Sequence, residues 1–204
     1  MLSVENLTCA RGGVPVLTGV GFTVPEGQAL ILRGPNGIGK TTLLRTLAGL
    51  QPAVEGTVDY PEDEGAYASH ADGIKTALSV TENLKFWADV HGTGLPDDIF
   101  EVFDLSDLRD RIGGTLSAGQ KRRLGLARLG VIGRKVLFLD EPTVSLDRFS
   151  VKMFADWLQN THLASGGVAV IATHIDLGFP APELELTPFK AALDARGGSD
   201  EAFL

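Results

Sequence analysis

The chain has 204 residues, of which 44% are hydrophobic and 22% charged, and its formal net charge is −8. These values predict a folded core and exclude a disordered chain, and the acidic balance argues against nucleic acid as the main partner, although a local basic patch at 121–123 stays open. The apolar runs at 136–139 and 168–172 fall well short of the roughly 18 residues of a membrane-spanning helix, and the N-terminus lacks a signal-peptide pattern, so we expect a cytoplasmic protein that does not span a membrane.

Strand-like segments separated by turn residues fill the first third of the chain. They fall at about 2–8, 22–24, 28–33 and 54–60. A short helix is predicted over 40–47, because Gly49 and then Pro52 follow it. The single cysteine, Cys9, cannot form an internal disulfide and follows a strand-like segment, so we expect a core residue rather than a reactive thiol.

A phosphate-binding loop is predicted between the strand at 28–33 and the helix at 40–47. The run matches the pattern GxxxxGK[ST] and comprises Gly34, Pro35, Asn36, Gly37, Ile38, Gly39, Lys40, Thr41 and Thr42. Glycines let successive backbone N–H groups point at phosphate oxygens, and the positive N-terminal end of the helix adds to the attraction. We expect Lys40 to reach the β- and γ-phosphates and Thr41 to supply an oxygen to Mg²⁺. A plain glycine-rich turn is the alternative, but strand, loop and helix occur in the required order.

The pattern becomes helical between about 79 and 133. Ser79 and Glu82 form a capping-box signature, and Leu84 and Trp87 follow at helical spacing. Trp87 and its neighbour Phe86 either belong to the core or line a docking groove for a partner. Strand signals return at 135–139 and 167–172, with an amphipathic helix over 147–159 between them, which is typical of a βαβ unit.

Two carboxylates, Asp140 and Glu141, end the apolar strand at 136–139. Ligands in open α/β sheets sit at the carboxyl ends of the strands. We therefore expect Asp140 to hold Mg²⁺, directly or through water, and Glu141 to act as the general base toward the attacking water. A merely solvated pair of acids is the alternative.

A second anion site is predicted where a basic amphipathic helix begins. The segment comprises Leu116, Ser117, Ala118, Gly119 and Gln120. A serine hydroxyl and glycine amides at a helix N-terminus can bind an anion, although by itself this run also fits an ordinary N-capped helix start.

With these three motifs together, the chain resembles the ATP-binding cassette (ABC) family over about 2–186. The resemblance implies an α/β fold of the P-loop NTPase type, with a mainly parallel sheet, an antiparallel β subdomain and a helical insertion. It implies one ABC domain over 1–204, in which about 1–71 and 134–190 form the ATP-binding core and about 72–133 form a helical subdomain. It also implies ATP and Mg²⁺ as cofactors, and a homodimer in which segment 116–120 of one copy closes over the γ-phosphate held by the other. The tail at 189–204 either frays or forms a short helix.

The resemblance assigns further residues by position. The segment formed by Ser145, Leu146 and Asp147 is similar to the loop that passes between subunits and couples the two ATP sites. His174 is similar to the switch histidine that contacts the γ-phosphate and helps orient Glu141, whereas a lone histidine at a strand end would more often be structural.

Two positions depart from the family pattern. Arg11 stands where an aromatic residue usually stacks on adenine, and its planar guanidinium can take that role. His70 stands where a glutamine is usual, so it either contacts phosphate or magnesium-bound water or is a plain loop residue.

Smaller details are most similar to the ATP-binding subunits of bacterial haem exporters in cytochrome c maturation. Lys121, Arg122 and Arg123 replace the more usual x-Gln-Arg after segment 116–120. This likeness implies an ABC-type ATPase at the cytoplasmic face of the inner membrane that binds integral membrane subunits and drives export or release of haem or a haem chaperone. Its membrane contact would run only through those partners. Another small exporter, a soluble ABC ATPase acting on ribosomes or DNA, and a phosphotransferase are the rival functions.

Overall fold

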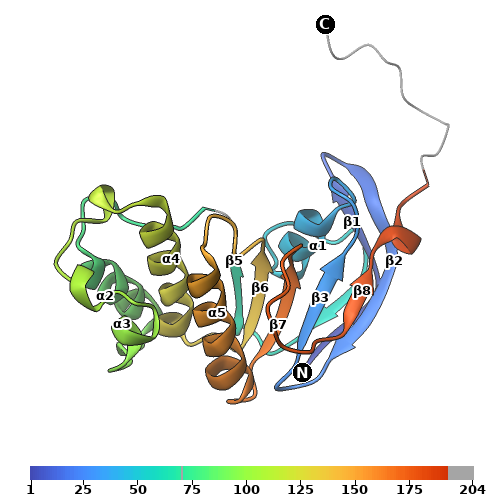
Figure 1. Ribbon diagram of the computed structural model, residues 1–204. Helices are drawn as coiled ribbons and strands as arrows, with labels where there is room; N and C mark the ends of the chain where they lie inside the picture. Colours follow the sequence, from blue (N-terminus) through green and yellow to red (C-terminus); the bar gives the residue numbers. More distant parts are fainter. Residues whose placement is uncertain (70, 193–204) are drawn as a thin grey trace, which may run out of the picture.

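Two sheets with helices packed on them make up the computed structural model, which describes residues 1–69 and 71–192 (Figure 1). The parallel sheet has the order β5-β6-β7-β3-β8 and consists of β3 Ala29–Arg33, β5 Gly65–Ala68, β6 Val136–Asp140, β7 Val168–Ala172 and β8 Glu183–Glu185. The antiparallel sheet has the order β2-β1-β4 and consists of β1 Leu2–Arg11, β2 Val14–Val24 and β4 Glu55–Asp59. The predicted α/β class, with a mainly parallel sheet and an antiparallel part, is confirmed.

The central parallel strands are buried on both faces, which explains why they read as continuous apolar runs. Side chains alternate across the sheet, so β6 contributes Leu137 and Leu139 to one core and Val136 and Phe138 to the other. The second of these cores lies between the two sheets and contains the apolar face of α1 Lys40–Leu47. Cys9 lies there and is fully buried, as expected.

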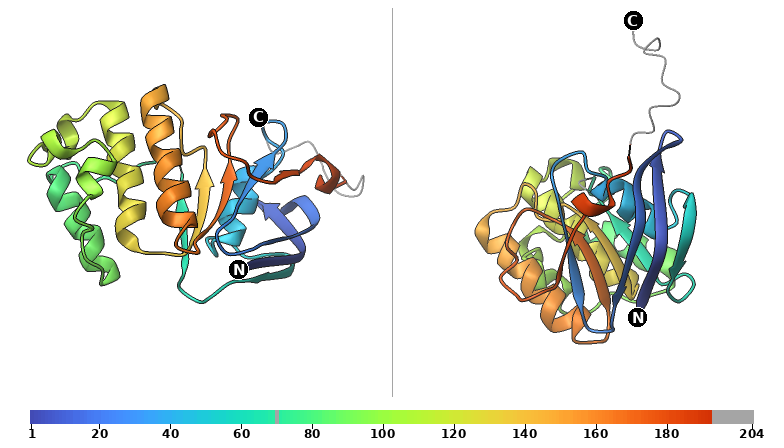
Figure 2. Two further views of the ribbon diagram at one scale, coloured as in Figure 1. Left: turned by 60° about the horizontal axis from the view of Figure 1, so that its bottom comes forward. Right: turned by 90° about the vertical axis from the view of Figure 1, so that its right-hand side faces the viewer.

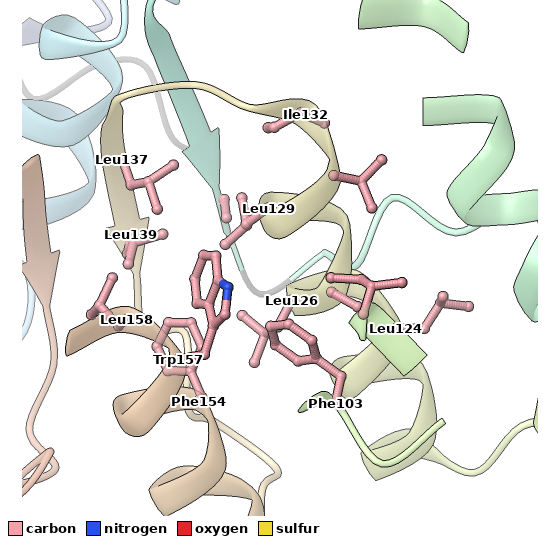
Figure 3. Close-up of a cluster of buried hydrophobic side chains, with 14 of the residues drawn as sticks. Phe103, Leu124, Leu126, Leu129, Ile132, Leu137, Leu139, Phe154, Trp157 and Leu158 are labelled. Atoms are coloured by element: carbon pink, nitrogen blue, oxygen red, sulfur yellow. The ribbon is translucent and has the colours of Figure 1, made fainter. Parts of the chain in front are cut away.

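The first core faces the larger helices. It is covered by α4 Ala118–Ile132 and by α5 Arg148–Trp157, which continues as a π-helical turn over Leu158–Leu163. Figure 3 shows Trp157 in the middle of this cluster, with Phe103 beside it at a ring-centroid separation of 5.4 Å. Because α1 and α4 pack in different cores, they lie on opposite faces of the parallel sheet.

A set of shorter helices extends the structure beyond α4, away from the antiparallel sheet (Figures 1 and 2). It consists of α2 Val80–His91, α3 Ile99–Val102 and the 3₁₀ turns Ser106–Leu108 and Gly113–Thr115. The capping box is confirmed, because the Glu82 backbone N–H donates to Ser79 Oγ and the Ser79 N–H donates to Glu82 Oε2. Trp87 is half-buried and packs against the first core, and Arg128 Cζ lies 4.7 Å from the centroid of its ring. No helix within the described ranges is long and apolar enough to cross a membrane.

Some boundaries differ from those predicted. The strands β1 and β2 are longer, because they form a hairpin closed by Gly12 and Gly13, both with positive φ, as a two-residue turn requires. The strand β8 was not predicted, since it has only three residues in a polar, proline-flanked run. The described end of the chain forms a 3₁₀ turn over Thr187–Phe189 and then bridges to β2; 193–204 lie outside the described residues.

Candidate active site

The predicted phosphate-binding loop joins the carboxyl end of β3 to the start of α1. Gly34, Gly37 and Gly39 have φ values of 139°, 81° and 119°, which side-chain-bearing residues rarely adopt. Gly39 is the N-cap of α1 and gives no side-chain cap, so no capping side chain within the described ranges occupies the first-turn N–H groups of this helix. The loop therefore offers backbone donors at a positive helix end, as an anion site requires.

Lys40, Glu141 and His174 meet at this edge of the sheet. Lys40 Nζ donates to Gly34 O at 2.7 Å and lies 3.4 Å from His174 Nε2. The same histidine nitrogen lies 3.5 Å from Glu141 Oε1. Lys40 follows β3, Glu141 follows β6 and His174 follows β7, so the parallel order of these strands brings them together.

The two carboxylates occupy different environments. Asp140 is buried and accepts a hydrogen bond from the Tyr67 hydroxyl at 3.1 Å, from the neighbouring strand β5. Burial, followed by the negative charge of Asp140, raises the pKa of Tyr67 to about 12. Glu141 is half-buried and has φ 49°, and its N–H donates to Ala172 O at 2.8 Å. This left-handed conformation turns the chain out of β6 immediately after Asp140.

Two residues of the site were missed by the sequence analysis. Tyr67 was assigned no role, because its pairing with Asp140 depends on strand order. Arg33, at the end of β3, donates to Thr173 O, next to His174, and pairs with Glu183 at 2.7 Å. The hydrogen bond with Glu183 raises the pKa of Arg33. These partners lie 140 and 150 residues from Arg33, so no local pattern reveals them.

The second predicted anion segment begins α4 with another capping box. Gln120 N–H donates to Ser117 Oγ at 3.3 Å, and Ser117 N–H donates to Gln120 Oε1 at 2.9 Å. Leu116 is buried, but Ser117 and Ala118 are exposed. Within one chain, this segment does not share a face of the sheet with the phosphate-binding loop, because α4 and α1 pack on opposite faces.

The loop at 145–147 lies next to this segment. A Cβ placed on Gly119 would lie 3.8 Å from Ser145 O. Ser145 is exposed with φ 67°, and Leu146 packs against the first core, beneath α4 and α5. Asp147 accepts a hydrogen bond from Ser150 N–H at 2.8 Å and caps α5, which lowers the pKa of this carboxyl.

Of the two positions that depart from the family pattern, Arg11 and His70, the structure describes only Arg11. Arg11 is exposed at the end of β1. The preceding strand end is held beside α1, because Gln51 Nε2 donates both to Ala10 O at 3.3 Å and to Thr42 O at 3.2 Å. His70 lies outside the described residues.

The site provides few protein ligands for a metal. The described part of the chain contains no group of three or more His, Cys, Asp or Glu residues that could hold an ion by itself. Thr41 is exposed at the start of α1, and Asp140 ends β6. One hydroxyl and one carboxylate fit Mg²⁺, which keeps several waters and takes its remaining ligands from phosphate.

Comparison with known proteins shows to which family the chain is similar. Residues 17–144 match the family described as ABC transporter. The "Cytochrome c biogenesis ATP-binding export protein CcmA" of Roseobacter denitrificans is 60% identical over 100% of this chain and 99% of its own length. The protein of the same name from Paracoccus denitrificans is 58% identical, again over 100% and 99%.

Solved structures show the same fold. A putative ABC transporter ATP-binding protein from Pyrococcus furiosus superimposes with a TM-score of 0.82 at 24% identity, covering 93% of this chain and 99% of that one. The cbiO1 protein from Clostridium perfringens, described as part of an ABC transporter complex, has a TM-score of 0.69 at 26% identity, covering 85% and 78%.

Proposed function

The chain belongs to the ABC transporter family, and we propose that it is the ATP-binding and ATP-hydrolysing subunit of an export complex for cytochrome c biogenesis. The observation that carries the enzymatic part is the meeting of Lys40, Glu141 and His174 at the carboxyl ends of neighbouring parallel strands. The full-length likeness to export proteins of cytochrome c biogenesis carries the biological part.

Binding of ATP phosphates involves residues 34–42. Lys40 Nζ exchanges the carbonyl oxygen of Gly34 for oxygens of the β- and γ-phosphates, and the first N–H groups of α1 donate to the same phosphates. Thr41 and Asp140 would hold Mg²⁺, which would neutralise charge on the phosphates. The hydrogen bond from Tyr67 fixes one oxygen of Asp140, and among the described residues no hydrogen bond occupies the other.

Hydrolysis is assigned to Glu141 and His174. Glu141 accepts the proton of the attacking water, and His174 Nε2, midway between Lys40 and Glu141, contacts the γ-phosphate and orients the base. Arg33 holds the carbonyl of Thr173 and so fixes the backbone that carries His174.

Two copies are needed to complete each site. Segment 116–120, in which Ser117 and Ala118 are exposed, begins a helix on the opposite face of the sheet from α1, so we assign it to the ATP held by a partner copy. The neighbouring loop at 145–147 then lies between the copies and links the two nucleotides. Arg11 stacks on adenine in this arrangement, and residues 72–133 form a helical subdomain within a single ABC domain.

The partners and cargo are inferred from the relatives. We infer that integral membrane subunits bind the helical subdomain at the cytoplasmic face of the inner membrane, and that the complex exports or releases haem or a haem chaperone. Affinity purification from native membranes tests this. Recovery of membrane subunits with haem absorbance is the expected result, and recovery with ribosomes would contradict it.

The base assignment is tested by Glu141→Gln. Removal of a general base lowers kcat for ATP hydrolysis by about 10² to 10⁴. Binding of ATP should be retained, because the phosphate-binding residues are unchanged. Glu101→Gln, on α3, is the matched control and should hydrolyse ATP at the normal rate. Turnover that survives Glu141→Gln would overturn the assignment.

A further inference from the structure

Arg122 is a buried cation that none of the motifs accounts for. It lies near the start of α4, two residues after Gln120, and its relative exposure is 4%. A buried arginine must satisfy up to five N–H donors, so its partners show what it holds in place.

Its guanidinium joins three separate segments of the chain. Nε donates to Pro142 O at 2.8 Å, and Nη2 donates to Glu141 O at 2.9 Å. Nη1 donates to Ser69 O at 2.7 Å and pairs with Asp72 Oδ1 at 3.0 Å. Four donor contacts therefore link α4 to the turn after β6 and to the loop after β5.

The contact with Glu141 falls where the backbone is strained. Glu141 has φ 49°, a conformation that a non-glycine residue keeps only when its surroundings impose it. Its N–H is held by Ala172 O and its carbonyl by Arg122, so both flanking peptide groups are fixed. The direction of the Glu141 carboxylate follows from this fixed backbone.

We propose that Arg122 is a positioning residue, which couples the direction of the Glu141 carboxylate to the position of α4. The inference rests on the proposed function, in which the N-terminus of α4 contacts the nucleotide of the partner copy. Movement of that helix would then shift Glu141, the proposed general base of the same chain, through the rigid guanidinium of Arg122. At Glu141 and Pro142, Arg122 donates to the backbone carbonyls and not to the Glu141 carboxylate, so we class it as a positioning residue and not as a catalytic one.

These contacts require the planar guanidinium of arginine, whose N–H groups point in several fixed directions. A lysine keeps the charge and can pair with Asp72, but its single ammonium cannot reach Pro142, Glu141 and Ser69 in three directions. We therefore expect Arg122→Lys to lower kcat for ATP hydrolysis about 10- to 100-fold, as small misplacements of catalytic groups do. The KM for ATP should change less than about threefold, because no phosphate ligand is touched.

The matched control is Arg134→Gln, which removes a half-buried arginine just beyond the other end of α4. Among the described residues, its side chain has a polar contact with His91 and none with the candidate active site. We expect a normal kcat for this variant. An equal fall in kcat for both variants, or an Arg122→Lys enzyme with normal kcat, would overturn the proposal.

A double-mutant cycle separates positioning from a structural role. In the Glu141→Gln background, Arg122→Lys should slow single-turnover hydrolysis by less than about threefold, because both changes act through one group. A full additional 10- to 100-fold loss would show that Arg122 does not act through Glu141. If Arg122→Lys fails to fold, Asp72→Asn offers a second variant, because it weakens the ion pair that holds the Arg122 guanidinium. Asp72→Asn should also lower kcat, and an unchanged kcat would refute the proposal. Turnover that survives Glu141→Gln alone would instead refute the base assignment.

Discussion

Lys40, Glu141 and His174 are brought together by strand order rather than by sequence proximity. β3, β7 and β6 are neighbours in the parallel sheet, so the residues that follow them emerge at one edge. The 3.4 Å and 3.5 Å separations around His174 Nε2 place this residue between Lys40, the proposed phosphate-binding lysine, and Glu141, the proposed base. At the scale of single residues, the chemistry depends on side chains that these strands hold in fixed positions.

Tyr67 gives a pH-dependent prediction. Its pKa is raised to about 12 in the folded chain, so the folded state keeps the phenolic proton at pH values where the unfolded chain has lost it. The free energy of unfolding therefore falls as pH rises from the ordinary tyrosine pKa toward the folded value. Phenylalanine carries no such proton. The stability difference between the wild type and Tyr67→Phe should shrink between pH 9 and pH 12, as measured by urea denaturation at each pH. A difference that stays constant over this range would contradict the assigned environment.

The junction between the phosphate-binding loop and α1 gives a prediction at the scale of elements. Gly39 has φ 119°, and a Cβ there would lie 3.1 Å from Leu17 Cγ, whereas Gly37 has φ 81° and open space around it. In both alanine variants the positive φ lowers the free energy of unfolding by about 1–2 kcal/mol. Gly39→Ala also overpacks the core, which typically adds about 1–3 kcal/mol.

Chemical denaturation of the two variants measures this difference. We expect Gly39→Ala to lower the free energy of unfolding more than Gly37→Ala does. Equal destabilisation would mean that Leu17 moves aside and that the close approach has no energetic consequence.

The two capping boxes allow the proposed nucleotide contact of Ser117 to be tested against a serine with a capping role alone. Ser79 caps α2 and Ser117 caps α4 with the same pair of hydrogen bonds. Each serine-to-alanine change should cost about 1 kcal/mol of stability. Only Ser117→Ala should also lower ATP hydrolysis, because only Ser117 is assigned to a nucleotide. Equal ATPase rates in the two variants would favour an ordinary helix cap at both positions.

Local signals explain which elements were predictable. The phosphate-binding loop, the Asp140 strand and the Ser79 cap each lie within a few consecutive residues, and the structure has these elements at the predicted places. The pairing of Tyr67 with Asp140 and the contacts of Arg33 depend on strand order and on partners far along the chain. The strand β8 is short and polar and forms only because β3 offers it a neighbour. The roles of the site residues remain predictions.

In the proposed dimer, each chain supplies only part of each nucleotide site. The phosphate-binding loop and segment 116–120 begin helices in different cores, on opposite faces of one sheet. Val144, Phe149 and Ile175 are large apolar side chains that remain exposed next to the loop at 145–147 and His174. Exposed apolar side chains at these positions are consistent with the proposed closure by a second copy.

A disulfide cross-link tests this closure most directly. Asn36 is exposed and, unlike Gly37, needs no positive φ, so Asn36→Cys can be combined with Ser117→Cys in a Cys9→Ala, Glu141→Gln chain. Two copies paired head to tail should form the intermolecular cross-link when ATP is trapped and not in its absence. Asn36→Cys with Ser79→Cys, in the same background, should not cross-link. Failure of the Asn36–Ser117 pair to cross-link with trapped ATP, or equal cross-linking of the Ser79 control, would contradict the composite site.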